Sequence, residues 1–292
     1  MVHKDQASQL RLTVNEHQKS STIKPVSTKA HVMAVVSGKG GVGKSNFVVN
    51  FSLALTNVNK KVLIIDLDLG MANIDLLMGK TSKHSMIDMM KNKWPITTIV
   101  EKARDDLHYV TGGSALAEFV HLHSEDLEFF TNELSSIVED YDVILLDFGA
   151  GITSSGTKLL FAAHDVIVVT TPEPTSLTDG YGMIKFIHKE DPLLPVHLLV
   201  NQTKNQEQAL AITSNIKKVC RSFLNKKIEF FGFLPKDNVV WESVCNQRPY
   251  IKDKPQSKVS KAMVKVAYDY CGKPKTDRYP FVTKLKGWLT NK

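Results

Sequence analysis

A glycine-rich loop constrains the fold of this chain more than any other sequence feature. The loop is Ser37–Ser45, with the sequence SGKGGVGKS; the apolar run Val32–Val36 precedes it, and residues 46–55 follow with apolar side chains at helical spacing. It fits the pattern G-x-x-x-x-G-K-[S/T], in which backbone N–H groups close around phosphate oxygens because glycine has no Cβ. A strand, this loop and a helix in that order predict a nucleotide-binding domain.

Each part of the loop has an expected role in holding the nucleotide. Lys44 is placed to reach the β- and γ-phosphates, and the Ser45 hydroxyl group is placed to ligate Mg²⁺. The N-terminus of the following helix adds partial positive charge at the same position. The residues expected to bind the nucleotide here are Gly38, Gly40, Gly41, Val42, Gly43, Lys44, Ser45 and Asn46.

Predicted strands alternate with predicted helices along residues 30–272. We predict strands at 31–37, 61–68, 108–111, 142–147, 166–171, 196–201 and 227–232. We predict helices near 46–59, 74–79, 85–92, 95–103, 124–140, 205–225, 238–246 and 256–271, and another that begins near residue 175. Strands that are apolar on both faces indicate a parallel sheet covered on both sides. The expected fold is therefore a three-layer, doubly wound α/β domain with a mostly parallel sheet.

Carboxylates stand at the ends of two predicted strands. Asp66 and Asp68 end the second strand, and Asp147 ends the strand 142–147. Ligands of such sheets bind at the carboxyl ends of the strands, where the phosphate loop also lies. A carboxylate beside the phosphate loop can hold Mg²⁺ through water, so Asp147 is a candidate metal residue.

Lys39 is a second lysine in a loop that needs only one. The run KGGVGKS at residues 39–45 resembles the deviant Walker A motif of the MinD/ParA class of ATPases, and the resemblance covers residues 30–272. It implies that ATP or ADP binds with Mg²⁺ and that the chain forms a homodimer with ATP. It also implies that Lys39 reaches the partner subunit's nucleotide and acts in trans, as an arginine finger does. The alternative is an ordinary solvated lysine.

The same resemblance implies roles for residues outside the loop. Asp68 would orient the attacking water, and Asp66 would support Mg²⁺ and phosphate positioning; the alternative for each is a helix-capping or solvated carboxylate. The catalytic candidates are Lys39, Lys44 and Asp68, and the metal candidates are Ser45, Asp66 and Asp147. The positions that match the family's adenine contacts are Asn201, Pro235 and Asp237, although Asn201 is equally compatible with a turn.

Charge is unevenly distributed along the chain. The formal net charge is +7, yet residues 216–292 contain 18 lysines and arginines against 6 acidic residues. This excess indicates either an anionic partner, such as a membrane, a nucleic acid or an acidic protein, or solubility alone. No apolar run approaches the roughly 20 residues that span a bilayer, and no secretory signal precedes the domain. Three widely spaced cysteines are typical of reduced thiols, so we expect a cytoplasmic protein without a metal cluster.

The end of the chain predicts a polar connector followed by a short amphipathic helix. We therefore expect residues 273–292 to lie outside the ATPase-like domain as a segment of their own. The apolar face of this helix consists of Phe281, Leu285, Trp288 and Leu289, with lysines around it. Such a face is typical of a helix that lies on an anionic membrane surface. The alternatives are a helix docked on its own domain or on a partner protein.

The first residues resemble a narrower group within this class. The residues are Asp5, Gln6, Ala7, Leu10 and Arg11, followed by a linker rich in Ser, Thr and Lys up to residue 29. They are similar to the activator motif of FlhG-type ATPases (also called YlxH or FleN), which regulate flagellar number and placement. The resemblance implies that this motif stimulates the GTPase FlhF, and that flagellar switch (C-ring) proteins are further partners. The loop DFGAG at 147–151 departs from the proline usual in MinD and favours this group.

The sequence thus predicts an ATP-hydrolysing switch that dimerises, binds the inner face of the cell membrane reversibly and regulates flagella. Two alternatives of the same family remain open: a division-site ATPase like MinD, and a ParA-like ATPase that positions DNA or cargo. A ligase or kinase of the same fold is a third alternative. The apolar C-terminal face favours membrane over DNA, because DNA contact does not require it, so we expect no specific DNA partner.

Overall fold

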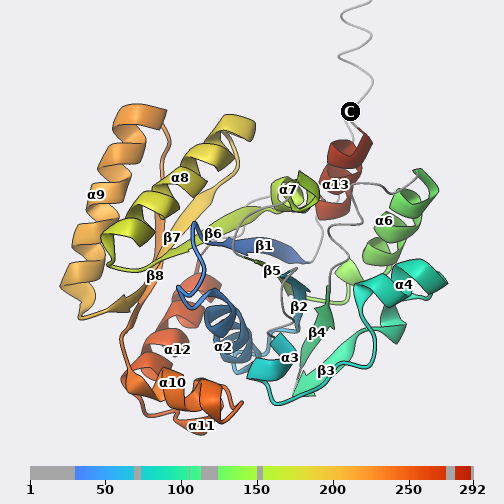
Figure 1. Cartoon of the computed structure of the whole chain (residues 1–292), viewed down its shortest axis with the longest axis horizontal. Helices are drawn as coiled ribbons and strands as arrows, with labels where there is room; N and C mark the ends of the chain where they lie inside the picture. Colours follow the sequence, from blue (N-terminus) through green and yellow to red (C-terminus); the bar gives the residue numbers. More distant parts are fainter. Residues whose placement is uncertain are drawn as a thin grey trace, which may run out of the picture.

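The computed structural model describes residues 30–68, 74–104, 106–112, 124–149, 154–273 and 280–290. In this part of the chain, eight strands form one sheet in the order β3-β4-β2-β5-β1-β6-β7-β8 (Figure 1). The strands are β1 His31–Val36, β2 Val62–Leu67, β3 Glu101–Arg104, β4 Leu107–Thr111, β5 Val143–Phe148, β6 Asp165–Thr170, β7 Val196–Thr203 and β8 Glu229–Pro235. The β3–β4 pair is antiparallel, and the other described pairs are parallel.

Helices cover both faces of this sheet, which confirms the predicted three-layer architecture (Figure 1). One face packs against α6 Ser124–Val138, α7 Ser154–Ala162, α8 Pro174–Glu190, α9 Gln206–Leu224 and α13 Phe281–Thr290. The other face packs against α2 Lys44–Thr56, α3 Ile74–Leu77, α11 Tyr250–Asp253 and α12 Lys258–Cys271. The remaining helices are α4 Met86–Asn92, a 3₁₀ turn η1 at Ile96–Thr98 and α10 Asn238–Cys245.

The strands in the centre are apolar on both faces because both faces are buried. Every residue of β2, β5 and β6 is buried, and in β1 the side chains alternate between the two cores. Val32, Ala34 and Val36 face the α6–α9 side, whereas Met33 and Val35 face α2 and α12. Alternation of this kind is the consequence of the two-residue period of a strand.

One predicted helix was wrong, and the helices α7 and α11 had not been predicted. The helix predicted at 95–103 is the 3₁₀ turn η1 followed by the edge strand β3, in which Glu101 pairs with Tyr109 and Lys102 with His108. Ile96 and Ile99 are buried, so their helix-like spacing reflects a short turn that packs on the core. The helix α7 had not been predicted, because Ser154, Ser155 and Gly156 read as a loop before its apolar residues.

The register of the strands brings the predicted functional carboxylates together. β1 lies between β5 and β6, so the loop that follows it opens at a point where the strand order reverses. Asp66 of β2 is aligned with Asp147 of β5, and Asp147 is also aligned with Val35 of β1. Sites at such switch points face the carboxyl ends of the strands, as the sequence predicted. In the described part of the chain, no helix is long and apolar enough to cross a membrane.

Candidate nucleotide-binding site

The phosphate loop has the backbone shape that its glycines permit. Gly41 and Gly43 have φ angles of 77° and 86°, and Gly43 directly precedes the first residue of α2. The positive φ favours glycine at position 43, and a Cβ atom there would lie 2.4 Å from the Asn201 side-chain nitrogen and displace that side chain. Asn201 Nδ2 donates a hydrogen bond of 2.7 Å to the Val42 carbonyl oxygen. Asn201 of β7 therefore supports the loop from the neighbouring strand.

The start of the loop lies against α8. A Cβ atom on Gly38 would come within 2.2 Å of the backbone carbonyl carbon of Asp179. Only a residue without a side chain fits there, so Gly38 permits the close approach of helix and loop. This contact makes α8 a wall of the site that the sequence had not indicated.

The central charges of the site are buried and paired. Lys44 Nζ lies 2.7 Å from Asp147 Oδ1, and these side chains are 8% and 0% exposed. Burial raises the pKa of the Asp147 carboxyl group, and the nearby charge of Asp68 raises it further. Lys44 and a hydrogen bond with Ser45 act in the opposite direction and lower this pKa. Lys44 therefore stabilises the ionised form of the Asp147 carboxylate, which burial alone would destabilise.

The residues around Asp147 fit a magnesium ion. Among the described residues, the second carboxylate oxygen, Oδ2, is buried and has no hydrogen-bond partner, and the Ser45 side chain interacts with the same carboxyl group. Carboxylate and hydroxyl oxygens beside bound phosphates are the ligands that Mg²⁺ prefers in proteins. An incoming nucleotide would offer phosphate oxygens to Lys44 and so compete with Asp147 for its ammonium group.

Asp66 and Asp68 lie at the same edge of the sheet. Asp66 is buried, and its two carboxylate oxygens accept backbone N–H groups of Asp68 at 3.0 Å and Ile74 at 3.4 Å. Asp66 thus fixes the path of the chain after β2. Asp68 is partly exposed and packs beside Gly149, where a Cβ atom would lie 2.8 Å from its Oδ1 atom. The predicted carboxylates converge, and their roles toward water and metal stay predictions.

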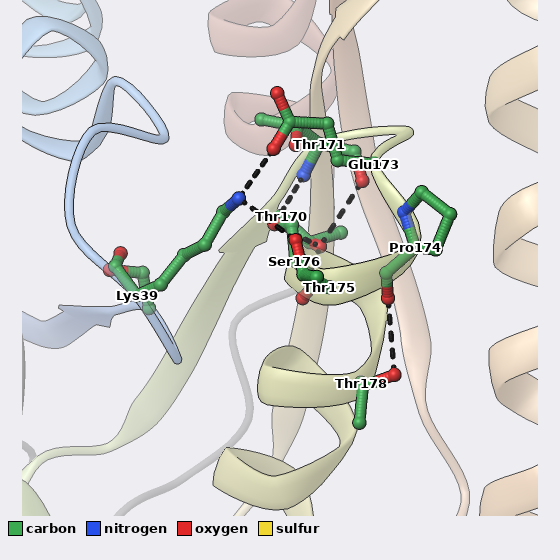
Figure 2. Close-up of polar contacts among 9 residues, drawn as sticks. Lys39, Thr170, Thr171, Glu173, Pro174, Thr175, Ser176 and Thr178 are labelled. Atoms are coloured by element: carbon green, nitrogen blue, oxygen red, sulfur yellow. Dashed lines mark hydrogen bonds and ion pairs between the residues drawn. The ribbon is translucent and has the colours of Figure 1, made fainter.

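Lys39 points away from the loop toward the start of α8 (Figure 2). Its ammonium group forms an ion pair with Glu173 and a hydrogen bond of 3.2 Å with Thr175 Oγ1. The Lys39 and Glu173 side chains are 30% and 64% exposed, and Lys39 lowers the pKa of the Glu173 carboxyl group. Sequence reasoning had not identified Glu173 or Thr175, because a residue at a helix start gives no signal of its partner across the fold.

A cavity of about 390 Å³ adjoins the phosphate loop. The residues predicted to contact adenine, Asn201, Pro235 and Asp237, line it together with Gly41, Gly43 and Asn46. The Asp237 carboxylate oxygens accept the backbone N–H groups of Val239 at 3.1 Å and Val259 at 3.3 Å. Asp237 thus caps α10 and ties it to α12, which shapes the wall of this cavity.

The C-terminal helix α13 docks on its own domain in this structure. Phe281 and Leu285 are buried in the core beside α6 and α7, and Trp288 and Leu289 pack against the same core. The Trp288 ring stacks on Phe161 of α7 with centroids 5.1 Å apart. This is the docked arrangement that the sequence left open beside the membrane prediction. The residues of the predicted N-terminal motif lie outside the described residues.

Comparison with known proteins agrees with this geometry. Residues 30–194 match the AAA_31 family, described as an AAA domain. The chain is 31% identical to the antiactivator FleN of Pseudomonas aeruginosa over 88% of this chain and 90% of that protein. It is 27% identical to the flagellum site-determining protein YlxH of Helicobacter pylori over 80% of each.

The fold also matches a solved structure, the septum site-determining protein MinD of Pyrococcus horikoshii in complex with Mg-ADP. The TM-score is 0.66 at 24% identity, and the match covers 83% of this chain and 96% of that chain. The chain therefore belongs to the MinD/ParA family of P-loop ATPases, and within it resembles the FlhG-type members FleN and YlxH.

Proposed function

We propose that this protein is a Mg²⁺-dependent ATPase switch that dimerises with ATP, binds the cell membrane reversibly and regulates flagella. The observation that supports it most is the arrangement of the phosphate loop. Buried Lys44 and Asp147, with the partly exposed Ser45 beside them, form a centre suited to one nucleotide with Mg²⁺, while Lys39 of the same loop lies outside that centre. Bound Mg²⁺ would neutralise phosphate charge, and Asp68 would orient the attacking water.

The position of Lys39 supports a role across a dimer interface. Its ammonium group is held by an exposed carboxylate and a hydroxyl group on α8, contacts that another anion can replace at little cost. In a face-to-face dimer, the partner subunit's phosphates would take the place of Glu173. Dimerisation would then bring into each site a positive charge that the monomer holds elsewhere.

Docking of α13 supports a link between nucleotide and membrane. α7 begins at Ser154, five residues after Gly149, which follows the strand that carries Asp147. Trp288 rests on Phe161 of this helix, and Lys284 Nζ donates a hydrogen bond of 3.0 Å to the Ala163 carbonyl oxygen. A shift of α7 on ATP binding would loosen these contacts and free the apolar face of α13. Two freed helices in a dimer would bind a membrane far better than one.

Vesicle binding tests this link. We expect the wild-type protein to co-sediment with anionic lipid vesicles in Mg-ATP and to remain in the supernatant in Mg-ADP. Phe161→Ala removes the ring under Trp288 and should raise binding in Mg-ADP, because the docked state of α13 is weakened. A chain that ends at Pro280 should not bind in either state.

A thermal melt of Phe161→Ala must show a folded protein, since Phe161 is fully buried. If that variant does not fold, Lys284→Ala offers a milder change at the edge of the same contact. Equal binding of the wild type in both nucleotide states would contradict the link.

The flagellar part of the proposal rests on FleN and YlxH and on the N-terminal motif. We expect a peptide of residues 1–20 to raise GTP hydrolysis by an FlhF-type GTPase, and the same peptide with Gln6→Ala and Leu10→Ala to have no effect. Phosphate release by the GTPase measures this directly. No stimulation by the wild-type peptide would remove this partner and leave a MinD-like ATPase with another target.

The proposed location is the cytoplasm and the inner face of the membrane, with flagellar switch proteins as further partners. The MinD matches keep a division-site role as the main alternative. DNA binding that survives removal of α13 would favour a ParA-like positioning ATPase instead.

A further inference from the structure

An exposed tryptophan lies at the cavity beside the phosphate loop. Trp241 of α10 is 71% exposed and is the largest side chain among the exposed apolar residues that the structure describes. It lines the 390 Å³ cavity together with Gly43, Pro235 and Asp237. We propose that the Trp241 indole stacks on the nucleotide base and makes this chain's affinity for adenosine nucleotides depend on a side chain outside the phosphate loop. This proposal rests on the proposed nucleotide site.

The wall that contains Trp241 suits the flat face of a base. Val240, Trp241 and Val244 line the cavity from the same helix, so this side of the cavity is apolar. Residues of the phosphate loop, Gly41 and Gly43, line the same cavity, and the charged part of a nucleotide belongs at that loop. A nucleotide with its phosphates at the loop would therefore extend its base toward the indole. An aromatic ring stacks on any base, because every base has a π-face.

The helix that carries the indole is fixed on the domain. Asp237 caps α10 through Val239 and reaches Val259 of α12 with its other oxygen, so the first turn of α10 is tied to two elements. Val239 and Val240 pack on the core, which fixes the orientation of the helix. The backbone that carries the indole therefore needs no ordering when a base binds.

The indole's exposure has another explanation, which is contact with a second subunit. That explanation predicts that Trp241 affects ATP-dependent dimerisation and leaves binding of ADP to the monomer unchanged. Base stacking predicts that ATP and ADP binding weaken together, because both nucleotides carry the same base. Inorganic triphosphate, which has no base, should bind equally well with or without the indole.

The test compares Trp241→Ala, Trp241→Phe and the wild type by calorimetry with ATP, with ADP and with inorganic triphosphate. We expect Trp241→Ala to weaken ATP and ADP binding by about 5-fold to 100-fold and to leave triphosphate binding unchanged. Trp241→Phe keeps a ring and should recover most of the affinity. Loss of ADP and triphosphate binding together would indicate damage to the loop and would overturn the proposal. Unchanged ADP binding by Trp241→Ala would overturn it as well.

Fluorescence supplies a second readout that keeps Trp241 in place. The tryptophans are Trp94, Trp241 and Trp288. In a chain with Trp94→Phe and Trp288→Phe, ADP should change the emission of Trp241, and inorganic triphosphate should not. No change at saturating ADP would contradict stacking. If the wild-type protein binds neither ADP nor ATP, the proposed nucleotide site itself fails, a result that is distinct from either outcome above.

Discussion

Lys39→Ala is expected to lower the rate of ATP hydrolysis by about 10³-fold or more, while ATP still binds. A positive charge supplied by a second subunit stabilises the charge that develops on the transferred phosphoryl group. In other phosphoryl-transfer enzymes, such a charge raises the rate by about 10³-fold or more. Binding should persist because Lys44 and the loop backbone remain in place. Phosphate release under saturating ATP measures the rate, and calorimetry measures binding.

Glu173→Gln is the matched control for this prediction. It removes the carboxylate that holds Lys39 in the monomer and leaves Lys39 and Thr175 in place. We expect this variant to hydrolyse ATP at least as fast as the wild type at low protein concentration, because Lys39 is freed for the partner subunit. The melting temperatures of both variants should stay close to that of the wild type, since the contact is exposed. An ordinary solvated lysine would leave the rate of Lys39→Ala unchanged.

Lys44→Ala is expected to weaken ATP binding by at least about 100-fold, because the buried ammonium group that we propose contacts phosphate is lost. The variant should also be less stable, since Asp147 would remain buried without the lysine that neutralises it. Without Lys44, the pKa of Asp147 rises further above its usual value. A carboxyl group whose pKa is higher in the folded than in the unfolded state binds protons more readily in the folded state. The free energy of unfolding therefore falls as the pH rises from the unfolded-state pKa to the folded-state pKa.

The pH dependence separates the two effects of this substitution. Relative to the wild type, Lys44→Ala should lose more stability at pH 7 than at pH 5, as measured by thermal melts at both values. The double variant Lys44→Ala/Asp147→Asn should recover stability at pH 7 and still fail to bind ATP. If Lys44→Ala binds ATP like the wild type, the assignment of this lysine to the phosphates is wrong.

Sequence patterns could predict which residues lie together at the centre of the candidate site, because those patterns are local, while the roles of these residues stay predictions. The glycine loop, the apolar strands and the carboxylates at their ends are adjacent in the chain or fixed by the parallel register that aligns Asp66 with Asp147. The sheet and its covering helices follow from strands that are apolar on both faces. To predict that these residues converge, only one general rule was needed: open α/β sheets bind their ligands at the carboxyl ends of the strands.

The features that the sequence did not predict depend on contacts between distant segments. Glu173 and Trp241 come near the phosphate loop through packing of α8 and α10, which no local pattern encodes. The predicted helix at 95–103 was wrong because residues 101–104 pair with β4 at the edge of the sheet, and that pairing is a contact between segments that no local pattern shows. The apolar face of α13 was recognised, yet its docking on Phe161 depends on a helix that had not been predicted.

Molar mass in solution tests the proposed switch most directly. Light scattering coupled to size exclusion, with Mg-ATP, Mg-ADP and the Lys39→Ala variant in Mg-ATP, compares the three states at one protein concentration. The proposed switch predicts twice the mass of the chain for the wild type in Mg-ATP, and the mass of one chain in the other two samples. A single mass in all three samples, with ATP shown to be bound, would contradict it.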